Sequence, residues 1–372
     1  MKSVMQFRHA KISLNDLASF VILALLMISI ADPVFEGLRY AKYGIPFVCI
    51  VVFIAKKLRF HIDGASKPFV VLAAVTLLMA PLGNVYGIHD FYFYLTALSP
   101  FLVGCAPKVS PRVMFKMLTA FFAVLSVPAV LEDGLVFSVL ESTSTLEDHS
   151  FAFVFGLFSI FFFMVKDKKY LIVSLILAIL VLKRISLLAM VLILTIYYLV
   201  PSVFIKRVAV LGLVVNISYL FAAYYITTDS FDHFSQVKFG VSSSFFTMGR
   251  TTLYASVFSD SNSLSTLLLG NGPGSSYSIA AASIFVADGK VNLHSDVLKV
   301  YYELGGLFFL FFFFMAYKLR DLRIYLFMYI NIILFTDNVS TYFIVMYVYF
   351  YLAQQLRGKN RSFGSALARD KL

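Results

Sequence analysis

The chain has 372 residues, of which 60% are hydrophobic and 14% are charged. A soluble domain carries about 25% charged and 45–50% apolar residues, so this composition excludes an ordinary water-soluble enzyme. The net charge of +11 would favour a nucleic-acid partner in a soluble protein. In a membrane protein the distribution of the charges between the two sides is more informative than their sum, and we expect no nucleic-acid partner.

Twelve apolar stretches, separated by polar clusters, follow one another along the chain. They predict an all-α polytopic integral membrane protein with about twelve transmembrane helices, several of them shorter than the roughly 20 residues that a straight span needs. The expected spans are 17–31, 42–55, 68–83, 90–106, 115–131, 149–165, 170–182, 185–200, 208–226, 296–316, 322–336 and 341–356. The predicted regions are a nine-span part (1–226), one long outer loop (227–295) and a three-span part with a basic tail (296–372).

Lysine and arginine concentrate in alternate connections between these spans. With the N-terminus in the cytoplasm, 23 of the 31 basic residues lie in cytoplasmic segments, as the positive-inside rule requires. The charges then sum to +18 on the cytoplasmic side and −7 on the outer side. We therefore expect both termini in the cytoplasm and the loop 227–295 on the outer side.

The apolar run 170–200 is interrupted only by Lys183 and Arg184. As one helix it would measure about 46 Å, against a hydrocarbon core of about 30 Å. It would also place ten later basic residues outside. We therefore predict a hairpin with Lys183 and Arg184 at its outer turn. Charge there usually faces a cavity or a partner, the alternative being that both side chains extend to lipid headgroups.

Two segments of the long loop carry unusual residues. The aromatic-rich stretch 245–255 predicts a short helix that brings Arg250 and Tyr254 to the membrane face. An apolar run then ends in a glycine turn that contains Gly270 and Gly272. This turn lacks the Gly-Lys-Ser/Thr sequence of a phosphate-binding P-loop, so by itself it predicts a plain turn more than an anion cradle.

His294 precedes the tenth predicted span. Ser295 or Asp296 is expected to cap that helix, which places His294 at the positive end of the helix dipole. That position favours a neutral imidazole and attracts anions. Lys299 and Glu303 follow at a spacing of four residues, which places them to pair with each other. A lone histidine at a membrane boundary is more often structural than catalytic.

Taken in order, these motifs resemble the C-terminal signature of the bacterial O-antigen polymerase and ligase superfamily. The match covers about 60 residues. A basic pair at the outer end of an earlier span is similar too. The matching residues are Lys183-Arg184, Gly249-Arg250 with Tyr254, Leu269-Gly270-Asn271-Gly272-Pro273-Gly274, His294-Ser295-Asp296-Val297-Leu298 and Glu303-Leu304-Gly305-Gly306.

The resemblance implies a GT-C-like glycosyltransferase at the periplasmic face of the bacterial inner membrane, acting on glycans linked to undecaprenyl diphosphate. No cluster of outer carboxylates resembles a metal site, so we expect fixed cations in place of a metal and no other cofactor, and direct displacement would invert the anomeric carbon. A chain-length regulator and a flippase of the same pathway are implied partners. The implied roles are catalytic base for His294, diphosphate binding for Arg184, Arg250 and Lys183, and support for Glu303, Gly270, Gly272 and Tyr254.

Polymerisation of lipid-linked repeat units is the first hypothesis for the reaction. The first alternative is an O-antigen ligase, which would transfer the finished glycan to lipid A–core. A flippase for lipid-linked oligosaccharides is less favoured, because the chain shows no half-to-half repeat and few charges within its spans. His149, at the mouth of the sixth span, is an alternative base.

Overall fold

The computed structural model describes residues 13–31, 37–56, 60–134, 136–138, 143–144, 146, 149–199, 207–247, 249–261, 263–284 and 291–357. Nearly all of them are helical. The helices of the first half are α1 (Leu14–Ile30), η1 (Leu38–Tyr43), α2 (Gly44–Ala55), α3 (Lys67–Leu78), η2 (Ala80–Leu82), α4 (Val85–Leu102), α5 (Pro111–Asp133), α6 (His149–Met164), α7 (Lys168–Val181) and α8 (Arg184–Leu199). The strands β1 (Phe137–Ser138) and β2 (Thr143–Ser144) pair antiparallel.

The second half continues with α10 (Val208–Tyr225), α11 (Asp229–Phe239), α12 (Ser243–Phe246), α13 (Arg250–Asp260), α14 (Leu264–Leu269), α15 (Ser275–Ser283), α16 (Asp296–Ala316), α17 (Arg323–Leu334), η3 (Val339–Thr341) and α18 (Phe343–Leu356). Each of the twelve predicted apolar segments coincides with a helix. Four described helical segments are long and apolar enough to cross a membrane, and six more are shorter apolar helices. The architecture is consistent with the predicted helical membrane protein.

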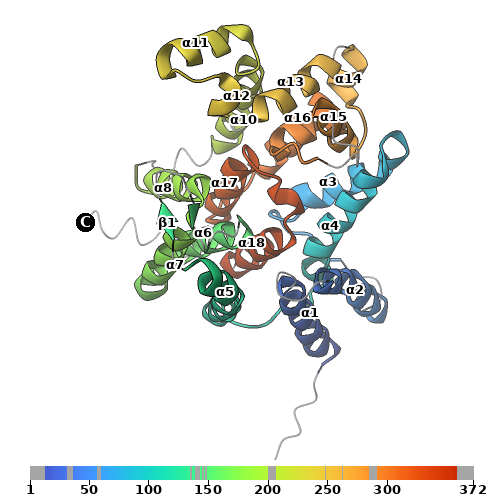
Figure 1. Cartoon of the computed structure of the whole chain (residues 1–372). Coiled ribbons are helices and arrows are strands. Elements are labelled where there is room, and N and C mark those ends of the chain that lie inside the picture. Colours follow the sequence, from blue (N-terminus) through green and yellow to red (C-terminus); the bar gives the residue numbers. More distant parts are fainter. Residues whose placement is uncertain are drawn as a thin grey trace, which may run out of the picture.

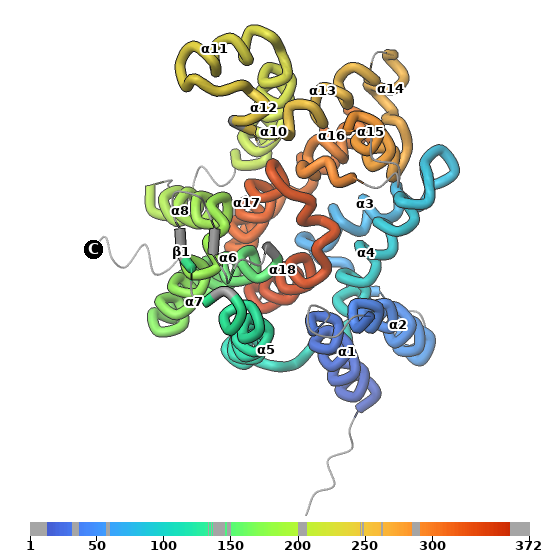
Figure 2. Tube along the Cα trace, viewed as in Figure 1, coloured from blue at the N-terminus to red at the C-terminus, as the bar shows by residue number. Residues whose placement is uncertain are grey.

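Helices α17 and α18 occupy the centre of the molecule (Figure 1). In this view α6 to α8 lie to their left, α5, α1 and α2 below them, α3 and α4 to their right and α10 to α15 above them, as the chain trace also shows (Figure 2). Helix α18 is apolar around its whole circumference and is buried along almost its entire length. A helix that is apolar on all sides can pack against other helices around its whole circumference, as α18 does.

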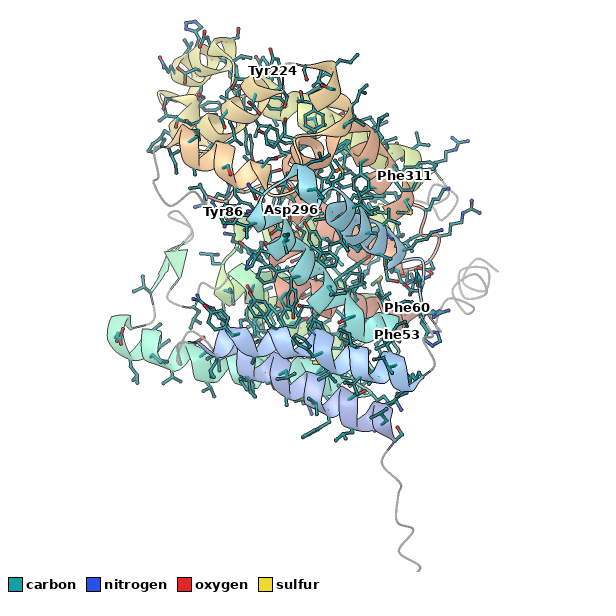
Figure 3. The ribbon with its side chains drawn as sticks, turned by 90° about the vertical axis from the view of Figure 1, so that its right-hand side faces the viewer. Phe53, Phe60, Tyr86, Tyr224, Asp296 and Phe311 are labelled. Atoms are coloured by element: carbon teal, nitrogen blue, oxygen red, sulfur yellow. The ribbon has the colours of Figure 1, made fainter. Side chains whose placement is uncertain are left out.

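The bundle has two ends, which are seen from the side in Figure 3. Tyr86 lies toward one end, called the site end below, Phe53 and Phe60 lie toward the opposite end, and Asp296 lies between them. Ion pairs join segments that the charge distribution assigns to the same side. They are Asp16–Lys108, Arg112–Asp167 and Asp63–Arg323 on the predicted cytoplasmic side, and Lys183–Asp337 and Asp90–Lys299 on the predicted outer side. The contacts therefore agree with the predicted partition of the segments.

The predicted reversal at Lys183 is present. Helix α7 ends at Val181, and Leu182 adopts a left-handed conformation (φ 49°) before α8 begins. Helix α7 runs antiparallel to α6, whereas α8 runs parallel to it, so the chain turns back between them. The contacts that show this are Tyr170 with Phe162, Ser186 with Ala152, and Tyr197 with Phe163.

Two differences from the predicted elements affect the site. The short helix expected over 245–255 is divided into α12 and α13, because Gly249 (φ 81°) adopts a left-handed conformation that interrupts the helix. Arg250 is therefore the first residue of α13. Helix α4 begins five residues before the predicted span, because the Asn84 side chain accepts a hydrogen bond from the Tyr86 amide and caps it. This places Asp90 inside a helix.

Candidate functional site

The predicted base lies directly before α16. His294 is exposed and has a positive φ of 54°. Ser295 is the N-cap, since its Oγ accepts a hydrogen bond from the Leu298 amide at 3.2 Å, which agrees with the prediction. The carboxylate of Asp296, the first helical residue, is buried and accepts two hydrogen bonds from Ser340, at 2.6 and 2.7 Å. The Asp296 side chain thus lies at the helix end where an anion was expected to bind.

Two tyrosines bring other segments to this helix start. The Tyr254 hydroxyl of α13 donates to the His294 carbonyl oxygen at 3.4 Å. The Tyr219 hydroxyl of α10 lies 2.9 Å from Ser295 Oγ and 2.5 Å from the Phe335 carbonyl oxygen. The two hydroxyls are 3.3 Å apart. These contacts join α10, α13 and the end of α17 around His294.

Arg250 is the first residue of α13, the helix that carries Tyr254. Its side chain is half-buried and begins the helix one turn before Tyr254. Burial raises the pKa of the Tyr254 hydroxyl, while its hydrogen bond with Tyr219 and the positive charge of Arg250 lower it. The carboxylate of Asp337 raises it. Arg250 and Asp337 therefore act in opposite directions on the pKa of the Tyr254 hydroxyl.

Lys183 reaches the same neighbourhood from the α7–α8 turn. Its Nζ lies 3.9 Å from Asp337 Oδ2, and its side chain is 20% exposed. Asp337 Oδ1 accepts a hydrogen bond from the Tyr342 hydroxyl at 2.6 Å, and the Asp337 carbonyl oxygen accepts one from the Asp296 amide at 3.3 Å. Arg184 beside it is exposed. The structure thus brings Lys183, which is more than 100 residues away in sequence, toward the start of α16.

The sequence analysis missed the loop that joins these parts. Asp337, Asn338 and Ser340 are all buried between α17 and α18. Both polar atoms of the Asn338 amide are buried and have no hydrogen-bond partner among the described residues. The sequence does carry a signal for this loop. The mostly polar segment from Thr336 to Thr341 lies between two apolar runs.

A second polar cluster lies inside the bundle, and it overturns the pairing suggested for Lys299. The Lys299 ammonium forms an ion pair with Asp90 of α4, and not with Glu303. Tyr277 of α15 lies between them, since its hydroxyl is 3.0 Å from Lys299 Nζ and 2.9 Å from Asp90 Oδ1. Burial raises the Tyr277 pKa, so this hydroxyl stays protonated. Glu303 instead accepts a hydrogen bond from Ser276 at 2.5 Å.

The predicted glycine turn caps a break in α16. Gly305 (φ 79°, ψ 166°) interrupts that helix, which leaves carbonyl groups before it without helical partners. The Asn271 and Gly272 amides donate to the carbonyl oxygens of Tyr302 and Glu303, both at 2.9 Å. A Cβ on Gly270 would overlap the Glu303 backbone. The structure therefore explains the glycines by close backbone packing.

The site end thus gathers Lys183, Arg250, Tyr254 and His294, whereas Glu303, Gly270 and Gly272 belong to the neighbouring α16 break. The His149 side chain lies outside the described residues. Within the described ranges, no three His, Cys, Asp or Glu side chains are grouped as metal ligands. No family model matches the chain, and no curated protein or solved structure is significantly similar to it.

Proposed function

We propose that this chain is a polymerase of oligosaccharide repeat units carried on undecaprenyl diphosphate, with twelve membrane crossings, a GT-C-like arrangement and its site at the periplasmic face of the bacterial inner membrane. The observation that carries the proposal is a pair of contact paths to the start of α16. Lys183 pairs with Asp337, whose carbonyl oxygen accepts a hydrogen bond from the Asp296 amide, and Tyr254, one turn after Arg250, donates to the His294 carbonyl oxygen. Glycosyl transfer requires the cations that bind the diphosphate to lie close to the base that activates the sugar hydroxyl.

In the proposed reaction, a hydroxyl oxygen of the acceptor sugar attacks the anomeric carbon of the donor glycan. The new glycosidic bond forms on the face opposite the breaking bond to the diphosphate, which inverts the anomeric configuration. The hydroxyl proton passes to His294. The diphosphate leaves with the bonding electron pair, and its growing negative charge requires fixed cations.

Arg250 and Arg184 are the proposed cations for the diphosphate. Their guanidinium groups form paired hydrogen bonds with phosphate oxygens. Lys183 is the weaker candidate, because Asp337 already compensates part of its charge. Glu303 is assigned a structural role, since its carboxylate is buried against Ser276.

The test is elongation of lipid-linked repeat units by the purified protein in detergent, without an ion gradient. His294→Ala should lower the rate by about 10²–10⁴-fold. Arg250→Ala should lower it strongly, and Arg250→Lys should restore only part of it, because an ammonium cannot form the paired contact. Lys238→Ala, which removes an exposed outer-loop cation on α11, is the matched control. Unchanged elongation in His294→Ala would remove that residue from the mechanism.

Deletion of the gene separates polymerisation from ligation and transport. Single repeat units on the lipopolysaccharide indicate a missing polymerase, whereas unattached lipid-linked polymer indicates a missing ligase. Full-length attached polymer in the deletion strain would refute both. Elongation in detergent excludes a flippase, which performs no glycosyl transfer.

A further inference from the structure

A surface pocket lies beside the α16 break. Its volume is about 420 Å³, which falls in the range of small-molecule sites. The start of α4, the end of α13, the glycine turn and α15 form its walls. Six polar residues line it: Asn84, Asp260, Asn271, Ser275, Ser278 and Tyr302.

The polar groups of this pocket suit a ligand with many hydroxyl groups. Asp260 Oδ2 accepts a hydrogen bond from the Tyr302 hydroxyl at 2.5 Å. The side-chain amide nitrogen of Asn84 (Nδ2) lies 3.0 Å from Ser278 Oγ. The side-chain amide nitrogen of Asn271 is buried beside the pocket and has no hydrogen-bond partner among the described residues. The lining combines carboxylate, amide and hydroxyl groups with apolar side chains. The polar groups can form hydrogen bonds with the hydroxyls of a sugar, and the apolar side chains can contact the apolar face of its ring.

The charge of the pocket separates it from the proposed diphosphate site. Its described lining contains the carboxylate of Asp260 and no lysine or arginine. A diphosphate would be repelled by this carboxylate. A neutral or amino-substituted sugar would accept or donate hydrogen bonds there without that penalty.

The pocket also lies at a useful distance from Arg250. Asp260 ends α13 and Arg250 begins it, so about 15 Å of helix separates them. One lipid-linked oligosaccharide can therefore place its diphosphate at Arg250 and a more distant sugar in the pocket. A backbone hydrogen bond joins two of the pocket walls. The backbone amide of Asn84, at the start of α4, donates to the carbonyl oxygen of Pro273 in the glycine turn at 3.0 Å. Because this contact fixes the backbone before a ligand arrives, less conformational entropy is lost when the ligand binds.

We propose that this pocket is a subsite for uncharged sugars of the repeat unit, away from the diphosphate. The assignment of a repeat unit as ligand rests on the proposed function. The expected binding of free neutral sugars does not rest on the proposed function, because it is inferred from the pocket lining alone.

The experiment measures binding of free saccharides to the full-length protein in nanodiscs by saturation-transfer NMR. The probes are galactose, N-acetylglucosamine, a neutral trisaccharide, glucuronic acid and inorganic pyrophosphate. Ser278→Phe should fill the pocket, and Asp260→Ala should remove its carboxylate. Both should weaken neutral-saccharide binding by about tenfold or more. Ser283→Phe, on the same helix but outside the pocket, is the matched control.

The outcomes distinguish the subsite from the proposed reaction. In the elongation assay, Ser278→Phe should raise KM and leave kcat nearly unchanged, whereas His294→Ala should lower kcat. Neutral-saccharide binding that survives in Ser278→Phe would refute the subsite and leave the polymerase proposal standing. Glucuronic acid or pyrophosphate binding that Ser278→Phe weakens as much as neutral-sugar binding would also refute it, because the pocket would then accept anions; pyrophosphate binding that Arg250→Ala removes belongs to the proposed diphosphate site. Saccharide binding without any elongation would refute the polymerase and support the pocket.

Discussion

Lys299→Met removes one partner of the ion pair between α16 and α4. The side chains of Lys299 and Asp90 are 3% and 2% exposed, so the variant leaves a carboxylate buried with only the Tyr277 hydroxyl as a partner. Breaking a buried pair in this way costs about 3–5 kcal/mol. We expect the free energy of unfolding to fall by this amount. The double variant Asp90→Leu with Lys299→Met should recover most of the loss, because no buried charge remains.

Thermal unfolding in detergent can be followed with a thiol-reactive dye, since Cys49 and Cys105 are both free and buried. Lys238→Met on the exposed face of α11 is the control and should stay within about 0.5 kcal/mol of the parent protein. The reasoning fails if Lys299→Met unfolds at the parent temperature. It also fails if the double variant is as unstable as the single one, because the cost would then not come from the unpaired carboxylate.

Three further predictions concern backbone strain, pH and metal ions. Gly249→Ala should cost about 1–2 kcal/mol for its left-handed conformation alone, whereas Gly270→Ala should cost more, because its Cβ also meets the Glu303 backbone; thermal unfolding ranks the two. A hydrogen bond from the Ser243 amide lowers the pKa of Asp232, so its contribution to stability is present above the ordinary pKa of about 3.9 and is lost as the pH falls through the lowered value. Hydrogen exchange of α11 and α12, corrected for intrinsic rates, should therefore rise in acid, and Asp232→Asn should remove most of the pH dependence. Elongation should persist in EDTA, since fixed cations are proposed to hold the diphosphate, and an absolute need for a divalent ion would contradict this.

The positions of the helices could be predicted because the length of an apolar run is local information. The turn at Lys183 was predictable for a different reason, since a straight helix would exceed the bilayer and reverse the charge distribution. The N-cap of α16 was predictable from Ser295 and its neighbours alone. The helix positions and the cap needed only adjacent residues, whereas the turn needed a physical length and the distribution of charge along the whole chain.

The partners of the buried charges could not be predicted in this way. Lys299 has Glu303 one turn away in sequence, yet its partner is Asp90, which lies 209 positions away. The i,i+4 spacing describes neighbours on a solvated helix surface, whereas α16 is surrounded by other helices. Asp337 was missed for the same reason, because its importance depends on Lys183 and Asp296 arriving from other segments.

The break at Gly305 couples the glycine turn to α16, one of the helices that are long and apolar enough to cross a membrane. A carbonyl group without a hydrogen bond costs several kcal/mol in a bilayer, and the loop supplies the missing donors to Tyr302 and Glu303. The glycine turn and the helix that begins after His294 therefore depend on each other for folding. A loss of activity in a Gly272 variant would then come with lower membrane abundance, whereas a true phosphate contact would affect activity alone. Measuring both quantities separates the two roles.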